Sequence, residues 1–199
     1  MGHREDLLVG AKLCLLEKGY ARTTARDIVA ASGANLASIG YHFGSKDSLL
    51  NAALMEATEE WSGELERALA VGIDPAADRV ERFTIVWDRI IELIRRHQGL
   101  WAAQFEMFGE IQRTPDMRPF VSQSQEHARR GLAALLQQVD PSLDDAAARL
   151  TATFYLVLMT GLIAQLLTDP ENAPSSSELA EAVRLVAAPA VSAPGAGTA

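Results

Sequence analysis

Side chains able to bind nucleic acid concentrate between Thr23 and Lys46, in the segment TTARDIVAASGANLASIGYHFGSK. Hydroxyl, guanidinium, amide, imidazole and ammonium groups are those that contact phosphate oxygens and base edges of DNA. With their small and apolar neighbours, and with Arg22 just before the segment, they form our candidate DNA contacts: Arg22, Thr23, Thr24, Arg26, Asn35, Leu36, Ala37, Ser38, Gly40, Tyr41, His42 and Lys46. The surrounding sequence must then supply elements that present them.

Two short helices meeting at a glycine are the predicted elements. Thr24 is an N-cap with Asp27 three residues later, the spacing of a capping box. Gly33 accepts the left-handed conformation that ends a helix, and Asn35 can cap a second helix over residues 36–41. On that helix Leu36 and Ile39 are predicted to point inward. This layout is typical of a helix-turn-helix, whose second helix enters the major groove of DNA.

The end of the second helix adds a candidate phosphate site. Ser45 can cap a third helix, so that Lys46 and the free amides at its start form an anion site beside Tyr41 and His42. Gly40 is less favourable than alanine in a helix by about 1 kcal/mol. We keep two alternatives: the reading helix ends near Gly40, so that base contacts come from residues 35–38, or its backbone there lies close to DNA.

These motifs resemble those of the tetracycline-repressor (TetR) family of bacterial transcription regulators. The resemblance rests on Gly19 with Tyr20, Thr23 with Thr24, Ser32 to Ala34, Tyr41 to Phe43, and Ser45 to Leu49. It covers the first fifty residues at motif level and the whole chain in length and helical layout. It implies that Tyr41, His42 and Lys46 contact phosphates. Gly40 stands where the family commonly has a tyrosine, which leaves the base-reading residue open.

The charge distribution favours DNA contact only near the N-terminus. The chain has a net charge of −8, but residues 1–50 hold six basic and five acidic side chains, a net charge of +1. The remaining residues therefore carry −9, which repels phosphate. Since each phosphate contact releases counterions, few contacts per chain predict weak non-specific binding, and a homodimer would double them.

The sequence predicts an all-α fold of about nine helices, with 199 residues and 48% hydrophobic side chains. Residues 1–48 are predicted to form a three-helix DNA-binding domain, 49–188 a larger helical ligand-binding and dimerisation domain, and 189–199 a disordered tail. The later helices are predicted at 49–70, 76–97, 100–112, 115–139, 144–167 and 177–187. Cys14 lies on an apolar face and is interpreted as a buried thiol, with a redox switch as the alternative. The charged start MGHREDLL predicts a cytoplasmic protein.

The segment from Leu150 to Thr168 carries no charge in 19 residues, which is long enough to span a membrane. Its threonines and flanking aspartates favour a helix buried against its own core and a second subunit. The family resemblance implies that the last two helices form the dimer interface of a homodimer. The predicted interface residues are Thr160, Gly161, Ala164, Leu179, Val183 and Val186.

Large apolar side chains recur on the helices that TetR-family regulators arrange around an inducer pocket. The candidate ligand contacts are Trp61, Trp87, Trp101, Phe105, Phe108, Phe120, Phe154, Tyr155 and Met159. Together they predict a small, mainly apolar inducer, hydrophobic or aromatic. The sequence contains no metal-ligand cluster and no cofactor motif, so neither a metal nor a cofactor is predicted.

We therefore expect a ligand-responsive repressor that binds a palindromic double-stranded DNA operator. One alternative is a helical interaction module with a vestigial DNA-binding head. Another is an enzyme that uses the aromatic cavity, but its four histidines, His3, His42, His97 and His127, are widely scattered. No catalytic spacing of residues supports it.

Overall fold

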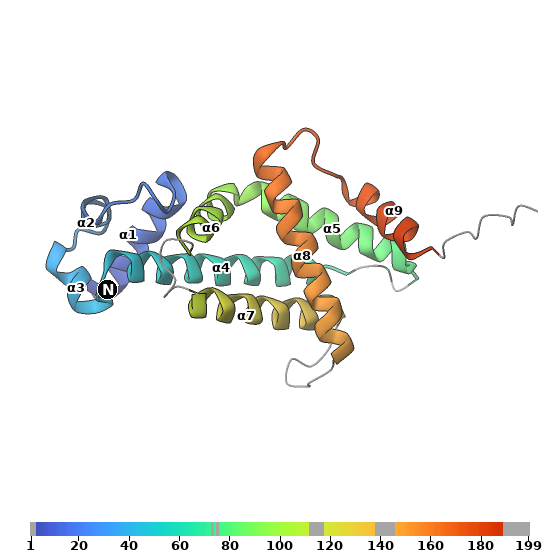
Figure 1. Cartoon of the computed structure of the whole chain (residues 1–199), viewed down its shortest axis with the longest axis horizontal. Coiled ribbons are helices and arrows are strands. Elements are labelled where there is room, and N and C mark those ends of the chain that lie inside the picture. Colours follow the sequence, from blue (N-terminus) through green and yellow to red (C-terminus); the bar gives the residue numbers. More distant parts are fainter. Residues whose placement is uncertain (1–2, 73, 75, 112–117, 138–145, 189–199) are drawn as a thin grey trace, which may run out of the picture.

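A computed structural model describes residues 3–72, 74, 76–111, 118–137 and 146–188. Within these ranges the chain forms nine helices and no strand (Figure 1), which confirms the all-α prediction. Their bounds are α1 (His3–Lys18), α2 (Ala25–Ser32), α3 (Leu36–Phe43), α4 (Lys46–Ala70), α5 (Arg79–Arg96), α6 (Gln98–Ile111), α7 (Arg118–Gln137), α8 (Ala146–Thr168) and α9 (Ser176–Ala187). The predicted tail at 189–199 lies outside the described residues.

Helices α1 to α3 form a head at one end of the molecule. The predicted capping box is present at the start of α2, because Thr24 accepts from the Asp27 N–H and Asp27 accepts from the Thr24 N–H. Gly33 ends α2 with φ of 68°, and Asn35 caps α3. Helix α3 continues through Gly40 to Phe43, so the alternative in which it ends near Gly40 is wrong.

Helix α4 joins the head to the larger helical part. Its N-cap is Ser45, whose hydroxyl accepts from the Ser48 N–H as the sequence predicts. Its buried residues run from Leu49 to Leu65, so α4 contributes to the core of the head and to the core of the larger part. Figure 1 shows α4 leaving α3 and running beneath α6 and beside α7.

The larger part is built from α5 to α9 around α4. Helix α8 packs mainly on α7, and α9 packs on α5, where the Ser176 hydroxyl donates to Asp88 Oδ1 at 2.5 Å. Helix α5 begins three residues later than predicted, because Asp78 caps it through the Glu81 N–H. Helix α6 also packs on α1, and at their contact a Cβ on Gly99 would lie 2.5 Å from the Leu16 carbonyl oxygen. Only glycine allows this close approach.

One hydrophobic core runs through both parts. It includes Leu7 and Ile28 in the head, Leu54 on α4, and Trp87 and Leu166 in the larger part. Cys14 is also buried, and burial raises the pKa of its thiol. Because only the thiolate is reactive, this supports the interpretation of Cys14 as a structural residue.

Candidate DNA interface and ligand cavity

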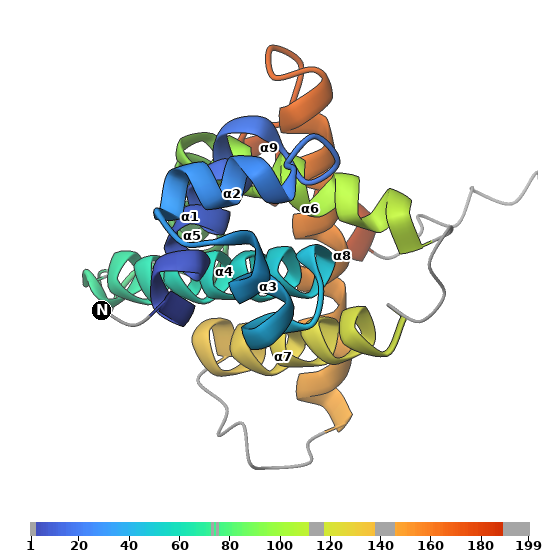
Figure 2. The same cartoon turned by 90° about the vertical axis from the view of Figure 1, so that its left-hand side faces the viewer.

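Helix α3 is anchored by Ile39 and presents the rest of its surface to solvent. Ile39 is buried, whereas Tyr41 is 86% exposed. The prediction that Leu36 points inward is wrong, because its side chain is 56% exposed. The reason is that α3 is short: Ile39 is its one buried residue, and Phe43 at its end packs on the core while partly buried. Figure 2 views the head from its outer side, with α3 in front of α4.

The first turn of α3 places small and amide side chains together. Asn35 Oδ1 accepts from the Ser38 N–H at 2.9 Å and from the Ser38 hydroxyl at 3.0 Å. Capping uses only the oxygen of the Asn35 amide, so its NH2 group stays available as a donor. Ala37 is exposed beside them. This end of α3 can therefore approach the base edges closely.

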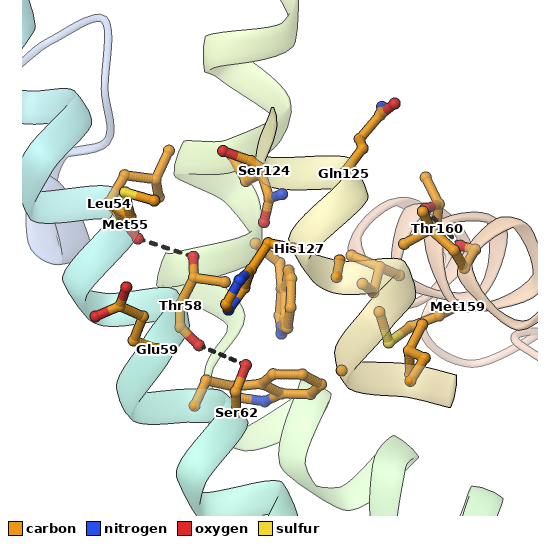
Figure 3. Close-up of a pocket in the computed structure, with 18 of the residues that line it drawn as sticks. Leu54, Met55, Thr58, Glu59, Ser62, Ser124, Gln125, His127, Met159 and Thr160 are labelled. Atoms are coloured by element: carbon orange, nitrogen blue, oxygen red, sulfur yellow. Dashed lines mark hydrogen bonds between the residues drawn. The ribbon is translucent and has the colours of Figure 1, made fainter. Parts of the chain in front are cut away.

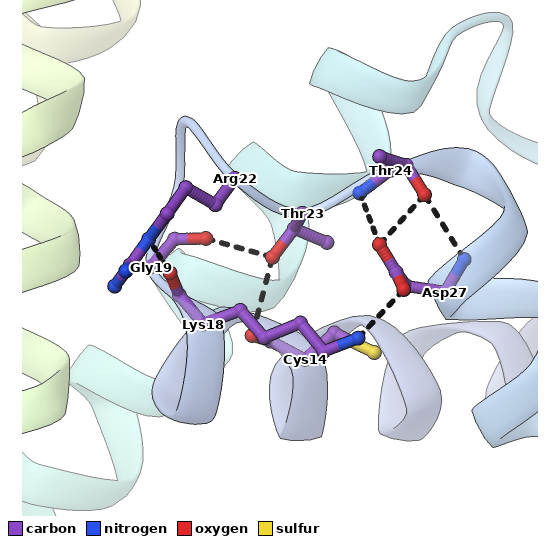
Figure 4. Close-up of polar contacts among 7 residues, drawn as sticks. All are labelled: Cys14, Lys18, Gly19, Arg22, Thr23, Thr24 and Asp27. Carbon is purple, nitrogen blue, oxygen red and sulfur yellow. Dashed lines mark hydrogen bonds and ion pairs between the residues drawn. The ribbon is translucent and has the colours of Figure 1, made fainter.

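The threonine pair before α2 divides into one structural and one exposed residue (Figure 4). Thr23 is 1% exposed, and its hydroxyl donates to the carbonyl oxygens of Cys14 and Gly19 at 3.1 and 2.7 Å. The prediction that Thr23 contacts DNA is therefore corrected, because its only polar side-chain group is enclosed. Thr24 is exposed at the N-terminus of α2, where a phosphate would be favoured.

Some basic side chains of the head form ion pairs with acidic residues, and others form none among the residues that the structure describes. Lys12 binds Glu56 and Glu60, and Lys18 binds Asp27 at 2.6 Å. By contrast Arg22 and Arg26 are exposed and form no ion pair within the described residues. Arg22 donates instead to the Lys18 carbonyl oxygen at 2.7 Å. Arg22 and Arg26 can therefore bind phosphate without breaking an ion pair.

Asp27 is the acidic residue of the capping box at the start of α2. Hydrogen bonds from Lys18, then from the hydroxyl and N–H of Thr24, hold the pKa of the Asp27 carboxyl well below its usual range. Asp27 is therefore ionised at neutral pH. Its charge is directed at Lys18 and the first turn of α2, where an anion is favourable.

Tyr41, His42 and Lys46 lie at the other end of α3. The rings of Tyr41 and His42 meet edge to face, with centroids 4.8 Å apart. Lys46 Nζ lies 3.3 Å from the Thr23 carbonyl oxygen and 3.2 Å from Asp47 Oδ1. All three residues are at least partly exposed, so a duplex lying along α3 would meet them together with the N-terminus of α4.

A cavity of about 220 Å³ lies between α4, α6, α7 and α8. Five of the predicted ligand contacts line it: Trp61, Trp101, Phe105, Phe108 and Met159. Trp61 and Trp101 pack edge to face, with ring centroids 4.8 Å apart. The cavity is therefore largely aromatic and apolar.

Three predicted ligand contacts lie elsewhere. Trp87 is buried between Phe83 and Tyr155, with ring centroids 5.6 and 6.4 Å away. Phe154 is exposed on the outer face of α8. The cavity lining therefore does not include Trp87, Tyr155 or Phe154. No described residue of α5 lines the cavity, and α8 lines it with other residues. The remaining prediction, Phe120, lies outside the residues whose side chains are described.

Several polar residues in the cavity lining were missed by the sequence analysis. They include Thr58, Glu59 and Ser62 on α4, Gln104 on α6 and His127 on α7. Figure 3 shows the His127 ring extending from α7 toward Thr58 and Ser62. The spacing of Thr58 and Ser62, four residues apart beside Trp61, places them on one side of α4 and could have indicated them.

The predicted dimer contacts also fall into two groups. Gly161, Val186 and Thr160 are exposed, and Ala164 and Val183 are partly exposed. Leu179 is buried within the chain's own core, so its predicted place in an interface is corrected. The same two helices carry further exposed apolar side chains, which enlarge this apolar surface: Leu150, Phe154, Val157 and Leu185.

The head contains a capped pair of helices whose second helix is exposed, and it is joined to a larger helical part. This arrangement is that of a helix-turn-helix DNA-binding regulator. Residues 7–53 match the model for bacterial regulatory proteins of the tetR family, and residues 78–189 match the tetracyclin repressor-like C-terminal domain. The chain therefore belongs to the TetR family. This confirms the predicted family and also the prediction that the chain is not an enzyme, since members of this family regulate transcription.

Similar proteins agree with this assignment. The transcriptional repressor KstR2 of Rhodococcus jostii is 34% identical over 76 residues, which are 38% of this chain and 37% of KstR2. The chain thus spans little more than a third of this curated relative. A TetR transcription regulator from Haloarcula marismortui shares the fold with a TM-score of 0.61 at 21% identity, over 93% of this chain and 94% of that one. The multidrug binding protein EbrR, complexed with imidazole, gives 0.61 at 25% identity, over 94% and 92%.

Proposed function

We propose that this protein is a cytoplasmic, ligand-responsive repressor that binds a palindromic operator as a homodimer and is released by a small, mainly apolar inducer. The observation that carries the proposal is the pairing of an exposed α3 with an aromatic cavity connected to it through α4. Helix α4 begins three residues after α3 ends and contributes Leu54, Trp61 and Leu65 to the cavity lining. EbrR, a relative in fold, is a multidrug binding protein.

The homodimer is supported by the outer face of α8. This helix is long and apolar enough to cross a membrane by length and composition, with 28% of its most apolar window buried. Leu150, Phe154 and Val157 are exposed at spacings of four and three residues, and therefore form one stripe. Val186 on α9 is also exposed, at 87%. Because Met159, Leu162 and Ile163 pack the opposite side of α8 in the core, a second copy fits this stripe better than lipid does.

Release of DNA follows from the placement of the cavity. Helices α4 and α6 both line it, and both also contact the head, α4 at α3 and α6 at α1. A ligand that binds more tightly to one arrangement of these helices shifts the population toward it. In a dimer this changes the spacing of the two α3 helices and lowers operator affinity, and by linkage operator DNA lowers ligand affinity equally.

The test is binding to a palindromic DNA fragment from upstream of the protein's own gene, measured by fluorescence polarisation over a salt series. We expect affinity that falls steeply with salt, and a solution mass of two chains. Tyr41→Ala and Lys46→Ala should each weaken binding about tenfold, and Lys46→Ala should also lower the salt slope by about 1. Arg79→Ala, which removes an exposed cation at the start of α5 outside the cavity lining, is the matched control. An interaction module with a vestigial head would show no salt-dependent binding, and that result would reject the proposal.

A further inference from the structure

Three buried polar side-chain atoms in the described part of the chain have no hydrogen-bond partner: Trp61 Nε1, Trp101 Nε1 and Gln104 Oε1. All three belong to residues that line the cavity between α4, α6, α7 and α8. Native proteins satisfy nearly all buried polar groups, and each one left unpaired is unfavourable. Their gathering at one cavity indicates that a bound molecule completes their hydrogen bonds.

The unpaired groups define what that molecule must offer. Trp61 and Trp101 are each 4% exposed, and their rings pack edge to face on neighbouring helices. An indole N–H can only donate, so both require an acceptor atom. Gln104 follows Trp101 by three residues on α6, and rotation of its amide can present either its oxygen or its NH2 group. An oxygen atom on the ligand satisfies the donors of this group.

The charges of the lining exclude an anion. Among the described residues that line the cavity there is no lysine or arginine, while Glu59 and Glu66 are both present. Neither carboxylate forms an ion pair within the described ranges. The remaining titratable side chain of the lining is His127. A carboxylate ligand would therefore enter without a fixed cation to pair with, against two negative charges.

We propose that the cavity binds a compact, uncharged, mainly apolar molecule with a carbonyl oxygen, and that the N–H groups of Trp61 and Trp101 donate to this oxygen. The volume of about 220 Å³ lies below the ~300–1,000 Å³ usual for sites of drug-sized ligands, which sets the size. Phe105, Phe108 and Met159 provide the apolar walls. This inference rests on the proposed function, because it takes the cavity to be the inducer site.

The test uses three probes with one aromatic body: 2-acetylnaphthalene, 2-ethylnaphthalene and 2-naphthoate. The first two differ by a carbonyl in place of a methylene group, and the third carries a negative charge. Isothermal titration calorimetry on the full-length protein should give a dissociation constant about tenfold lower for the acetyl compound than for the ethyl compound. The naphthoate should bind no better than the ethyl compound.

Two variants then assign the preference to the indole donors. Trp61→Phe and Trp101→Phe keep an aromatic ring but remove the N–H together with part of the indole surface. The ethyl probe reports the loss of ring surface alone, so each variant should reduce the acetyl-to-ethyl preference about threefold or more without weakening 2-ethylnaphthalene to the same extent. Trp87→Phe is the matched control, since Trp87 is buried outside the cavity, and should keep the preference. If one cavity variant does not fold, the other variant and the probe series on the parent protein still decide.

Equal affinity for the acetyl and ethyl probes, tightest binding of the naphthoate, or no binding of any probe would each overturn the inference. Operator binding, measured in parallel, separates this from the proposed function. A parent protein that binds its operator but shows no preference among the probes rejects the carbonyl ligand alone. A protein that prefers the acetyl probe yet never binds operator DNA rejects the repressor function and retains the site.

Discussion

The Glu106 carboxylate accepts a hydrogen bond from the Ala21 N–H at 2.9 Å, which joins α6 to the loop between α1 and α2. Gly19 in the same loop has φ of 86°, and a Cβ there would lie 2.6 Å from Glu106 Oε1. Five residues earlier, α6 supplies Trp101 to the cavity. The head is thus attached to a cavity helix by a direct contact as well as through α4.

Replacing Glu106 by alanine should loosen this attachment. The Ala21 N–H loses a charged acceptor, and we expect the free energy of unfolding to fall by about 1 kcal/mol, less than for a buried bond because the contact is partly exposed. Hydrogen exchange of the Ala21 amide should accelerate. Glu106→Gln keeps an acceptor oxygen and should show a smaller change in both. Unchanged exchange in the alanine variant would contradict the role assigned to this contact.

Thr23→Val tests whether Thr23 is structural. Valine has nearly the same shape, but it leaves the carbonyl oxygens of Cys14 and Gly19 without the Thr23 hydroxyl. We expect a loss of about 1–3 kcal/mol in unfolding free energy, measured by urea denaturation. Operator affinity, corrected for the folded fraction, should stay unchanged. Weaker operator binding by fully folded Thr23→Val would instead restore Thr23 as a DNA contact.

The head should lose stability in acid because of Asp27. Its pKa is below the usual value of 3.8, since Lys18 and then Thr24 hydrogen bond to the charged form. A carboxyl with a lowered folded-state pKa contributes stability that is fully present above its unfolded-state pKa and is lost as the pH falls below it. The difference in Tm between the parent and Asp27→Asn should therefore be constant above about pH 5 and shrink as the pH falls below about 4.

The control for this titration is Asp6→Asn on α1, because Asp6 forms no ion pair or hydrogen bond within the described residues. Replacing Asp6 removes one acidic side chain of the head without removing such a contact, so the comparison isolates the effect of the Asp27 contacts. A gap between the parent and Asp27→Asn that stays constant down to pH 2 would show that the carboxylate contributes nothing through its contacts with Lys18 and Thr24.

Phe154→Lys tests the proposed dimer face. Phe154 is exposed in the centre of the stripe that Leu150 and Val157 complete on α8. A lysine there is tolerated in a single chain but places two like charges near a two-fold axis in a dimer. We expect the solution mass to fall from two chains to one, with the helical content unchanged. Leu13→Lys, which alters an exposed apolar residue of α1, should leave the mass at two chains.

The elements of the head could be predicted because their signals are local. Thr24, Asn35 and Ser45 each bind a backbone N–H three residues away, so the sequence contains both partners of each cap. The orientation of Leu36 could not be predicted in this way. Spacing alone allows it to share a face with Ile39, and only the packing of α3 on α1 and α4 decides which of the two is buried.

In the cavity, too, the residue types could be predicted from the sequence, but their placement depends on tertiary packing. Trp61 and Trp87 are both buried tryptophans on amphipathic helices, and nothing in their local sequence separates a cavity residue from a core residue. Their difference arises from neighbours distant in sequence, Trp101 for one and Tyr155 for the other. The Glu106 contact spans 85 positions and leaves no local pattern at all.

Gly40 provides the sharpest test of how α3 meets DNA. It lies inside α3, and a Cβ placed on it would meet no atom within 4 Å outside its chain neighbours and the backbone of its own helix. Because alanine is the better helix former, Gly40→Ala should raise the free energy of unfolding by about 0.5–1 kcal/mol. If the backbone at Gly40 lies against the DNA, the same methyl group should weaken operator binding, by about tenfold. Ala37→Gly, the reverse change on the same helix, should lower stability by a similar amount.

A more stable Gly40→Ala protein that binds its operator less tightly is the outcome expected when this side of α3 faces the duplex, because the methyl group then meets DNA where the free protein has open space. Stability follows from thermal or urea unfolding, and affinity from fluorescence polarisation at fixed salt. A variant that gains stability and keeps its full operator affinity would show that the backbone of α3 stands away from the DNA at this point. The base contacts would then be confined to the first turn, from Asn35 to Ser38.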